Sequence, residues 1–288
     1  MLFKKNIFPF YHTVSDKNLP HISNLYPLKS IDQFQRELDF FQKNYTDISL
    51  MDLLALSKNG KLKDNNFFHL TFDDGLMENA TIISPILKER NLNATFFINP
   101  NFIGNEAIFY RYKIALIIEK CKNPELIKKL LTLTIHDSEM IDNLLKEYSI
   151  SLQNINIYMN ESEINSLIEK GFTIGAHSLT HPYYKHISFE EQKKQTNESI
   201  AIIQKKFNLS YNVFSFPFTD DGVSRELFQH IQADLTFGTA GVKDDEIRTQ
   251  IQRLPMDNLL GNPNVFIFKN LLSYRLKKII GKHLVKHE

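Results

Sequence analysis

The chain lacks the residues on which several classes of protein depend. It has no tryptophan and one cysteine, Cys121, in 288 residues, so no internal disulfide can form and nothing supports a disulfide-stapled secreted domain. Ten glycines and ten prolines exclude collagen-like and low-complexity chains. No run of about 18 apolar residues is present, so we expect no transmembrane helix.

The chain also has no excess of charge of either sign. The 34 Lys and Arg residues nearly balance the 33 Asp and Glu residues, which leaves a net charge of +1 and argues against a nucleic-acid binder. With 42% hydrophobic and 12% aromatic residues, the chain can bury one large core or two small ones at about 150 residues per domain. Lys4 and Lys5 would suit a signal peptide, but the apolar run Ile7–Phe10 contains a proline and is shorter than the roughly 7–15 residues required. We therefore expect a cytoplasmic protein.

Short apolar runs alternate with helical patterns along the chain, which predicts an α/β fold with parallel strands. Such strands could form either a barrel or an open sheet. The runs are Asn6–Tyr11, Phe67–Phe72, Ala94–Ile98, Phe172–Gly175, Val213–Phe216, Leu235–Gly238 and Ile251–Leu254. The helices expected between them are Ile31–Asn44, Met77–Glu89, Ser162–Lys170 and a helix that the capping box Ser188–Glu191 opens and that runs to about Phe207.

A helical insertion interrupts this alternation between about residues 102 and 159. Its helix-forming segments are Arg111–Lys122, Pro124–Leu131 and Ser138–Tyr148. Insertions of this kind often sit on the rim of a barrel and shape the substrate site, whereas a helical buttress away from the site is the alternative.

Two carboxylates follow the apolar run Phe67–Phe72 directly, in the sequence Asp73-Asp74-Gly75. The carboxyl ends of strands are where α/β folds form their sites, and two adjacent buried carboxylates need positive charge nearby. An exposed Asp-Asp-Gly turn is the alternative. His177 and His181 follow another apolar run at a spacing that, on one helical turn, places both imidazoles on one face. Two histidines and one carboxylate would leave open positions on a metal ion, as in catalytic sites.

Other strand ends carry single groups of interest. His12 follows the first apolar run and could act as a general acid, or it could be an ordinary surface histidine. Arg253 alternates with apolar neighbours, so it could point inward and hold a carboxylate ionised.

The segments Thr71–Gly75 and His177–Pro182 together resemble the polysaccharide deacetylase family, that is, the NodB-homology enzymes of carbohydrate esterase family 4. The resemblance covers about residues 6–257 without the insertion. It implies a distorted (β/α)7 barrel, which we place at residues 1–265 with the insertion at 102–159. It also implies a metal-dependent hydrolase that removes acetyl groups from N-acetylated sugars, that is, an enzyme acting on carbon–nitrogen bonds.

The resemblance also implies residue roles. Asp73 corresponds to the catalytic base, and Asp74, His177 and His181 correspond to the ligands of Zn²⁺ or another divalent transition metal such as Co²⁺ or Ni²⁺. The family's third motif usually carries an arginine that contacts the base; Val213–Phe218 has none, so we assign that role to Arg253.

The catalytic acid in this family is usually a histidine at the end of a late strand, but here the last strand ends in Pro255. Members similar to exopolysaccharide N-deacetylases look circularly permuted, with that histidine near the N-terminus, so we assign the acid role to His12. A backbone N–H near Phe218 is the expected donor to the oxyanion. A hydrolase of small amides and a non-catalytic carbohydrate-binding relative are the alternatives. The family's fourth motif usually includes a tryptophan, and its absence here, with that of the motif arginine, keeps the non-catalytic relative open.

The tail over residues 266–288 predicts a basic amphipathic helix. The pattern favours a final helix packed on the barrel with its basic face in solvent. The alternative is peripheral contact with an anionic membrane, which would suit a lipid-linked glycan substrate.

Overall fold

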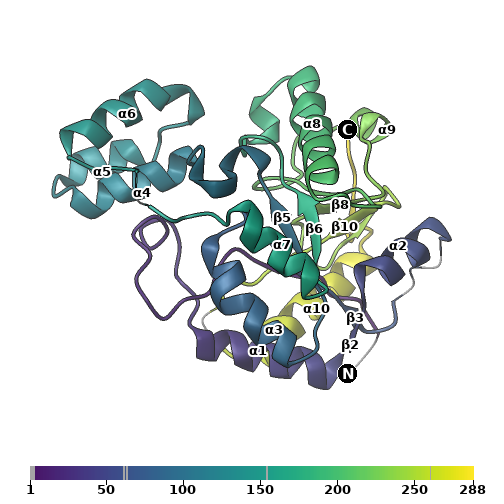
Figure 1. The fold of residues 1–288 in the computed structure, drawn as a ribbon. Coiled ribbons are helices and arrows are strands. Elements are labelled where there is room, and N and C mark those ends of the chain that lie inside the picture. Colours follow the sequence, from purple (N-terminus) through teal and green to yellow (C-terminus); the bar gives the residue numbers. More distant parts are fainter. Residues whose placement is uncertain (1–3, 61, 63, 154, 260) are drawn as a thin grey trace.

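The computed structural model describes residues 4–60, 62, 64–153, 155–259 and 261–288. Its central element is one sheet of parallel strands in the order β10-β8-β7-β6-β5-β4-β1-β11 (Figure 1). Each of the seven predicted apolar runs contributes to this sheet. The strands are β1 (Pro9–Tyr11), β4 (Leu70–Phe72), β5 (Ala94–Ile98), β6 (Thr173–Ala176), β7 (Val213–Ser215), β8 (Leu235–Gly238), β10 (Gln250–Gln252) and β11 (Leu254–Pro255).

The last predicted strand closes the sheet into a barrel. Its first part, β10, pairs with β8, and its second part, β11, pairs with β1 at the opposite edge. The partner changes at Arg253, whose N–H donates to the carbonyl of Gly238 at 3.1 Å, while the next N–H, of Leu254, donates to Phe8 at 2.8 Å. The distorted (β/α)7 barrel is thus confirmed, and the open sheet is wrong. The break at Arg253 coincides with the burial of its side chain inside the barrel.

Helices cover the outside of the barrel (Figure 1). Helix α1 shows why: Phe34, Leu38 and Phe41 recur at helical spacing and are fully buried, and the Ser30 side chain caps its start. The covering helices are α1 (Ile31–Asn44), α2 (Leu50–Lys58), α3 (Ser84–Glu89), α7 (Glu161–Glu169), α8 (Phe189–Lys206), α9 (Arg225–His230) and α10 (Pro263–Ile279). Shorter turns are the π-helix η1 (Asn79–Ile83) and the 3₁₀ helices η2 (Pro100–Asn105), η3 (Ile135–Asp137) and η4 (Tyr184–His186).

Two of the helix predictions need correction. The helix expected over 77–89 is a π-helical turn, η1, followed by the short helix α3. Only half of the predicted capping box of α8 forms. Ser188 accepts from the N–H of Glu191, but the Glu191 carboxylate accepts from the side chain of Gln195 instead of reaching back.

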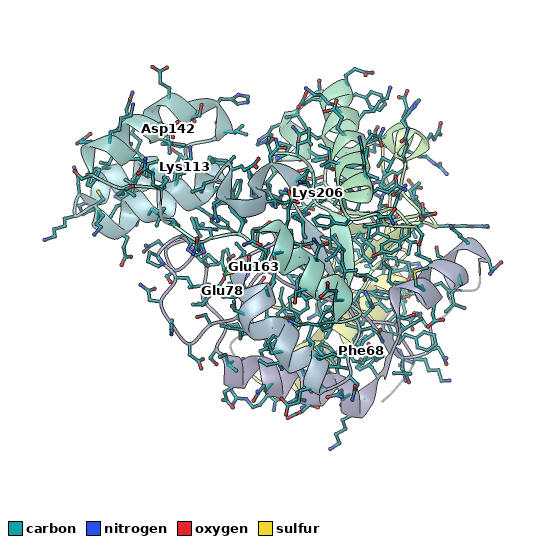
Figure 2. All side chains as sticks on the ribbon, viewed as in Figure 1. Phe68, Glu78, Lys113, Asp142, Glu163 and Lys206 are labelled. Carbon is teal, nitrogen blue, oxygen red and sulfur yellow. The ribbon has the colours of Figure 1, made fainter. Side chains whose placement is uncertain are left out.

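The predicted helical insertion forms three helices, α4 (Tyr110–Lys120), α5 (Pro124–Leu130) and α6 (Ser138–Glu147), which project from one side of the barrel (Figure 1). They share an apolar cluster of their own, which includes Ile117, Ile141 and Leu145. Lys113 and Asp142 join α4 to α6 through an ion pair of 2.7 Å (Figure 2). The insertion therefore has packing that does not depend on the barrel core.

The C-terminal helix is shorter than predicted. The helix expected over 266–288 ends at Ile279, and Gly281, with a φ of 71°, turns the chain away. The tail then forms β12 (Leu284–Val285), which pairs with β9 (Asp244–Asp245). A second short pair joins β2 (Thr46–Asp47) to β3 (Phe67–Phe68). Among the described residues, no helix is long and apolar enough to span a bilayer.

Candidate active site

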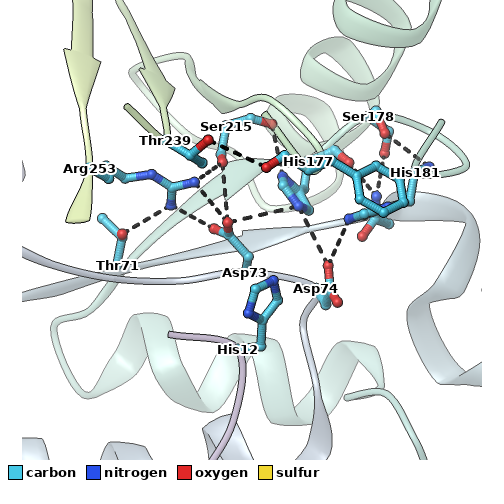
Figure 3. A network of polar contacts seen from close by, with 12 residues as sticks. His12, Thr71, Asp73, Asp74, His177, Ser178, His181, Ser215, Thr239 and Arg253 are labelled. Atoms are coloured by element: carbon cyan, nitrogen blue, oxygen red, sulfur yellow. Dashed lines mark hydrogen bonds and ion pairs between the residues drawn. The ribbon is translucent and has the colours of Figure 1, made fainter. Parts of the chain in front are cut away.

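The carboxyl ends of the strands bring the sequence-predicted residues together (Figure 3). His12 follows β1, Asp73 and Asp74 follow β4, and His177 follows β6. The chain can turn sharply after Asp73 because Asp74 and Gly75 both have left-handed backbones, with φ of 71° and 69°. The exposed-turn alternative for Asp73-Asp74 is wrong, because both side chains are buried.

Three side-chain atoms converge with the geometry of a metal site. Asp74 Oδ1 lies 3.5 Å from His177 Nε2 and 3.2 Å from His181 Nε2. A tetrahedral ion with bonds of about 2.1 Å has ligand–ligand edges of about 3.4 Å, so these separations match such an ion. None of the three atoms has a hydrogen-bond partner within the described part of the chain, although all are buried. Unpaired polar atoms at this depth are costly, and a bound cation would satisfy all three.

Neighbouring groups orient these three ligand atoms. His177 Nδ1 lies 2.8 Å from the Ser215 carbonyl, so this nitrogen carries the proton and Nε2 keeps its lone pair. Burial lowers the pKa of His181, which keeps that imidazole neutral as a metal ligand must be. Asp74 Oδ2 accepts the hydroxyl of Tyr112 at 2.5 Å, which leaves Oδ1 facing the histidines. The residues present therefore fit a divalent ion.

The two histidines do not lie on a helical turn, contrary to the prediction. Residues 177–181 form an irregular loop in which Ser178 and His181 have positive φ values of 63° and 56°. Hydrogen bonds from side chains stabilise this loop instead of the backbone hydrogen bonds of a helix. Ser178 Oγ accepts the N–H of His181 at 3.0 Å, and Gln195 Oε1 accepts the N–H groups of residues 179 and 180. The loop is thus fixed by α8, from which Gln195 projects.

Arg253 is fully buried and fixes Asp73. Its two terminal nitrogens donate to the two carboxylate oxygens of Asp73, each at 2.8 Å. The remaining N–H groups donate to Thr71 Oγ1, Ser215 Oγ and the Gly238 carbonyl, so all five donors are satisfied. Burial would raise the pKa of Asp73, but the guanidinium of Arg253 holds it below its usual value. Asp73 is therefore a carboxylate at neutral pH.

His12 forms a second charged pair across the pocket. Its Nδ1 lies 2.7 Å from Asp257 Oδ2, and its backbone N–H donates to Asp257 Oδ1 at 3.2 Å. Burial would lower the pKa of His12, but the Asp257 carboxylate raises it to about 9. His12 is therefore an imidazolium at neutral pH, with Asp257 holding Nδ1 and leaving Nε2 available.

A cavity of about 230 Å³ joins these groups, and it is lined by His12, Asp73, Asp74 and His181 together with aromatic side chains. Sequence reasoning missed part of this wall. Arg111 and Tyr112, on the first turn of α4, line the cavity, as does Tyr26 from the segment after β1. The insertion therefore does border the site, and it supplies the hydroxyl that Asp74 accepts. Only the tertiary structure links Tyr112 to Asp74, 38 residues away.

A second group of possible metal ligands, Asp220, Asp245 and His287, lies elsewhere. Its carboxylates already accept side-chain amides, because Gln252 donates to both aspartates. His287 pairs with Asp245 at 3.1 Å, and Asp245 raises the pKa of this histidine even though burial alone would lower it. These contacts explain the group as an ion pair that fastens the C-terminal tail.

Comparison with known proteins agrees with this geometry. Residues 61–235 match the family model described as polysaccharide deacetylase. The fold is similar to that of the Streptococcus pyogenes deacetylase PplD, solved with acetate, at 15% identity and a TM-score of 0.60 over 93% of this chain and 97% of that one. It is also similar to IcaB from Ammonifex degensii, at 14% identity and a TM-score of 0.61 over 94% and 97%. A de-N-acetylase from Aggregatibacter actinomycetemcomitans gives 16% identity and 0.58 over 92% and 99%. Comparison with curated proteins returns no match.

Proposed function

The chain belongs to the polysaccharide deacetylase family and is a carbohydrate deacetylase, and from this premise we propose that it hydrolyses the amide of an N-acetylated sugar or glycan with the help of a divalent metal ion. One observation carries the proposal: a cluster of three unpaired ligand atoms adjoins an arginine-bound carboxylate, and two of the three ligand residues line one cavity together with that carboxylate and an imidazolium. We further propose that residues 1–265 form one catalytic domain, with 102–159 as an insertion.

Asp74, His177 and His181 would hold the ion, which we propose to be Zn²⁺ or another divalent transition metal such as Co²⁺ or Ni²⁺. The bound ion would supply Lewis acidity to the attacking water and to the acetyl carbonyl. The protein's own part is to keep the site dry and the ligands deprotonated. Two contacts keep the ligand atoms deprotonated. The Tyr112 hydroxyl donates to Oδ2 of Asp74, and the Ser215 carbonyl holds the proton of His177 on Nδ1.

Asp73 is the proposed general base. Its carboxylate is ionised at neutral pH, lies 3.9 Å from His177 Nε2 and so borders the position of the attacking water. Arg253 donates to both oxygens of the Asp73 carboxylate, so this side chain cannot rotate away from its position in the site. This fixed orientation is what general-base transfer from a positioned water requires.

His12 is the proposed general acid. It is protonated by virtue of Asp257, and its Nε2 is the atom that would donate to the sugar nitrogen as the C–N bond breaks. The carbonyl oxygen becomes negatively charged in the tetrahedral state and needs a donor besides the metal ion. We assign that role to the backbone N–H of Phe218, which borders the cavity and has a left-handed φ of 58°.

The cavity also bears on the class of substrate. At about 230 Å³ it is smaller than the roughly 300–1,000 Å³ of typical ligand pockets, so it suits the residue that carries the acetyl group, with the rest of a glycan outside. Phe109, Phe218 and Tyr26 provide apolar faces on which a sugar ring can pack. A small-amide substrate would instead be enclosed entirely.

Acetate release from a panel of N-acetylated mono- and oligosaccharides tests the proposal. The protein is stripped with a chelator and then assayed alone and with Zn²⁺, Co²⁺ or Ni²⁺. We expect metal-restored release that rises from monosaccharide to oligosaccharide, and its absence in Asp73→Asn, which should still bind metal. Release from small amides but not from sugars would favour the small-amide hydrolase. Stoichiometric metal and sugar binding without release of acetate would favour the non-catalytic relative.

A further inference from the structure

An apolar stripe runs along the outer face of helix α10. Its residues are large hydrophobics that are between 46% and 81% exposed. Five of them recur at intervals of three or four and the sixth caps the helix: Val265, Phe268, Leu272, Leu276 and Ile279, then Ile280. Residues at this spacing share one face of a helix. The stripe holds six of the nine exposed large hydrophobic residues among those described, so it is a concentrated feature and not scattered exposure.

The stripe is not the face that attaches α10 to the barrel. Ile267, Leu271 and Tyr274 are buried and belong to the main core, where α10 packs beside α1. At 100° per residue these positions lie on the side of the helix opposite to Val265 and Leu276, while Phe268 lies at the edge of the stripe. The helix packs on the barrel as expected and exposes Lys269 and Lys278, but its outward face carries the apolar stripe as well.

The segment of chain that carries the stripe has charges of one sign. Residues 258–287 contain six Lys and Arg residues and no Asp or Glu, although the chain as a whole has a net charge of only +1. Lys269 lies within the stripe, and Lys277 and Lys278 follow it near the end of the helix. Long lysine side chains can extend their ammonium groups past a buried apolar face toward an anionic layer.

We infer that the outer face of α10 docks on the surface of an anionic lipid membrane, with its apolar stripe at the acyl boundary and its lysines among the headgroups. An exposed apolar stripe bordered by cations is the pattern of interfacial helices. A second copy of this chain is a poorer occupant, because residues 258–287 carry no acidic side chain to pair with the lysines of a second copy. None of the stripe residues lines the catalytic cavity, so docking leaves that cavity open.

Vesicle flotation with the full chain tests the inference. The vesicles are either pure phosphatidylcholine or the same lipid with about one-third phosphatidylglycerol. We expect binding to the anionic vesicles that weakens at high salt, and Phe268→Ser with Leu276→Ser to reduce the partition constant about tenfold or more. The matched control is Met51→Ser with Leu131→Ser, which removes two equally exposed hydrophobics elsewhere and should leave binding unchanged.

Three results would overturn the inference. They are no binding to either vesicle, equal binding to both, and binding that survives loss of the stripe. Gel filtration runs in parallel, and a wild-type dimer that the stripe variant converts to monomer, without vesicle binding, would assign the face to self-association instead. Acetate release from a soluble oligosaccharide should be the same in the stripe variant and wild type. Failure of the docking inference is thereby separable from failure of the proposed deacetylase activity.

Discussion

Replacing Asp257 with asparagine should move the alkaline limit of activity to lower pH. Among the described residues, the polar contact of the His12 ring is with the Asp257 carboxylate, whose Oδ2 lies 2.7 Å from Nδ1. The pKa of His12 is raised to about 9. Because the pKa in the folded state lies above that of a free histidine, His12 is protonated, and competent as an acid, at every pH below about 9. Activity should fall as the pH rises through that value.

The size of the effect follows from the two pKa values. Asparagine has nearly the same shape but no charge, so the variant loses the largest contribution that raises the pKa of His12, while burial still lowers that pKa and the carboxylates of Asp74 and Asp73 still raise it. The pKa of the variant should therefore fall toward the ordinary histidine value of about 6.5. At a pKa of about 6.5 the protonated fraction at pH 7.5 would fall from about 97% to about 9%, so the loss in rate should approach about tenfold. At pH 6 the two proteins should differ much less.

The assay is kcat/KM for acetate release against pH, with the metal site saturated. Asp221→Asn is the matched control, because Asp221 also pairs with a cation, Lys185 at 2.9 Å, but is exposed and outside the cavity. Its profile should coincide with that of wild type. If Asp257→Asn keeps the wild-type alkaline limit, then the group that titrates there is not His12, and the assignment of the acid is wrong.

Three further predictions concern the other contacts. Arg253→Lys should lower kcat about 10²-fold with little change in metal affinity, as measured by kinetics and calorimetry, because lysine cannot donate to both oxygens of Asp73; unchanged kcat would exclude a positioning role. Tyr112→Phe should weaken metal binding about 10- to 100-fold in chelator competition, while the neighbouring Tyr110→Phe should not. Metal at a concentration 100 times its Kd should raise the free energy of unfolding of the stripped protein by about 2.7 kcal/mol, which is measured as a higher melting temperature. His181→Ala should abolish that rise.

The sequence predicts the parts of this molecule that depend on local pattern. The apolar runs, α1 and the three insertion helices form because short-range periodicity and caps determine them. The strand ends also predict where Asp73 and His177 meet, since parallel strands place their carboxyl ends at one edge. The boundary errors lie where local preference competes with tertiary contact, as in the π-helical turn after Gly75 and in the tail that leaves α10 to pair with β9.

The contacts missed by the sequence include one made across the barrel. His12 and Asp257 are 245 residues apart and meet only because β11 closes the barrel against β1. The helical spacing of His177 and His181 predicted their proximity for the wrong reason. They converge through two left-handed residues and a glutamine from α8, none of which leaves a periodic signal in the sequence.

The arrangement of charges explains how one site can hold a base and an acid at the same pH. Both groups are buried, and burial alone would push each toward its neutral form, which is the wrong form for the task. Arg253 reverses this for Asp73, and Asp257 reverses it for His12, so the pKa values of the pair are driven apart. The proposed base is then ionised and the proposed acid protonated over the whole neutral range, and each charge also favours the other, because His12 lowers the pKa of Asp73 and Asp73 raises the pKa of His12. Because each partner is held by a different strand end, the closure of the barrel is also what sets the chemistry of the site.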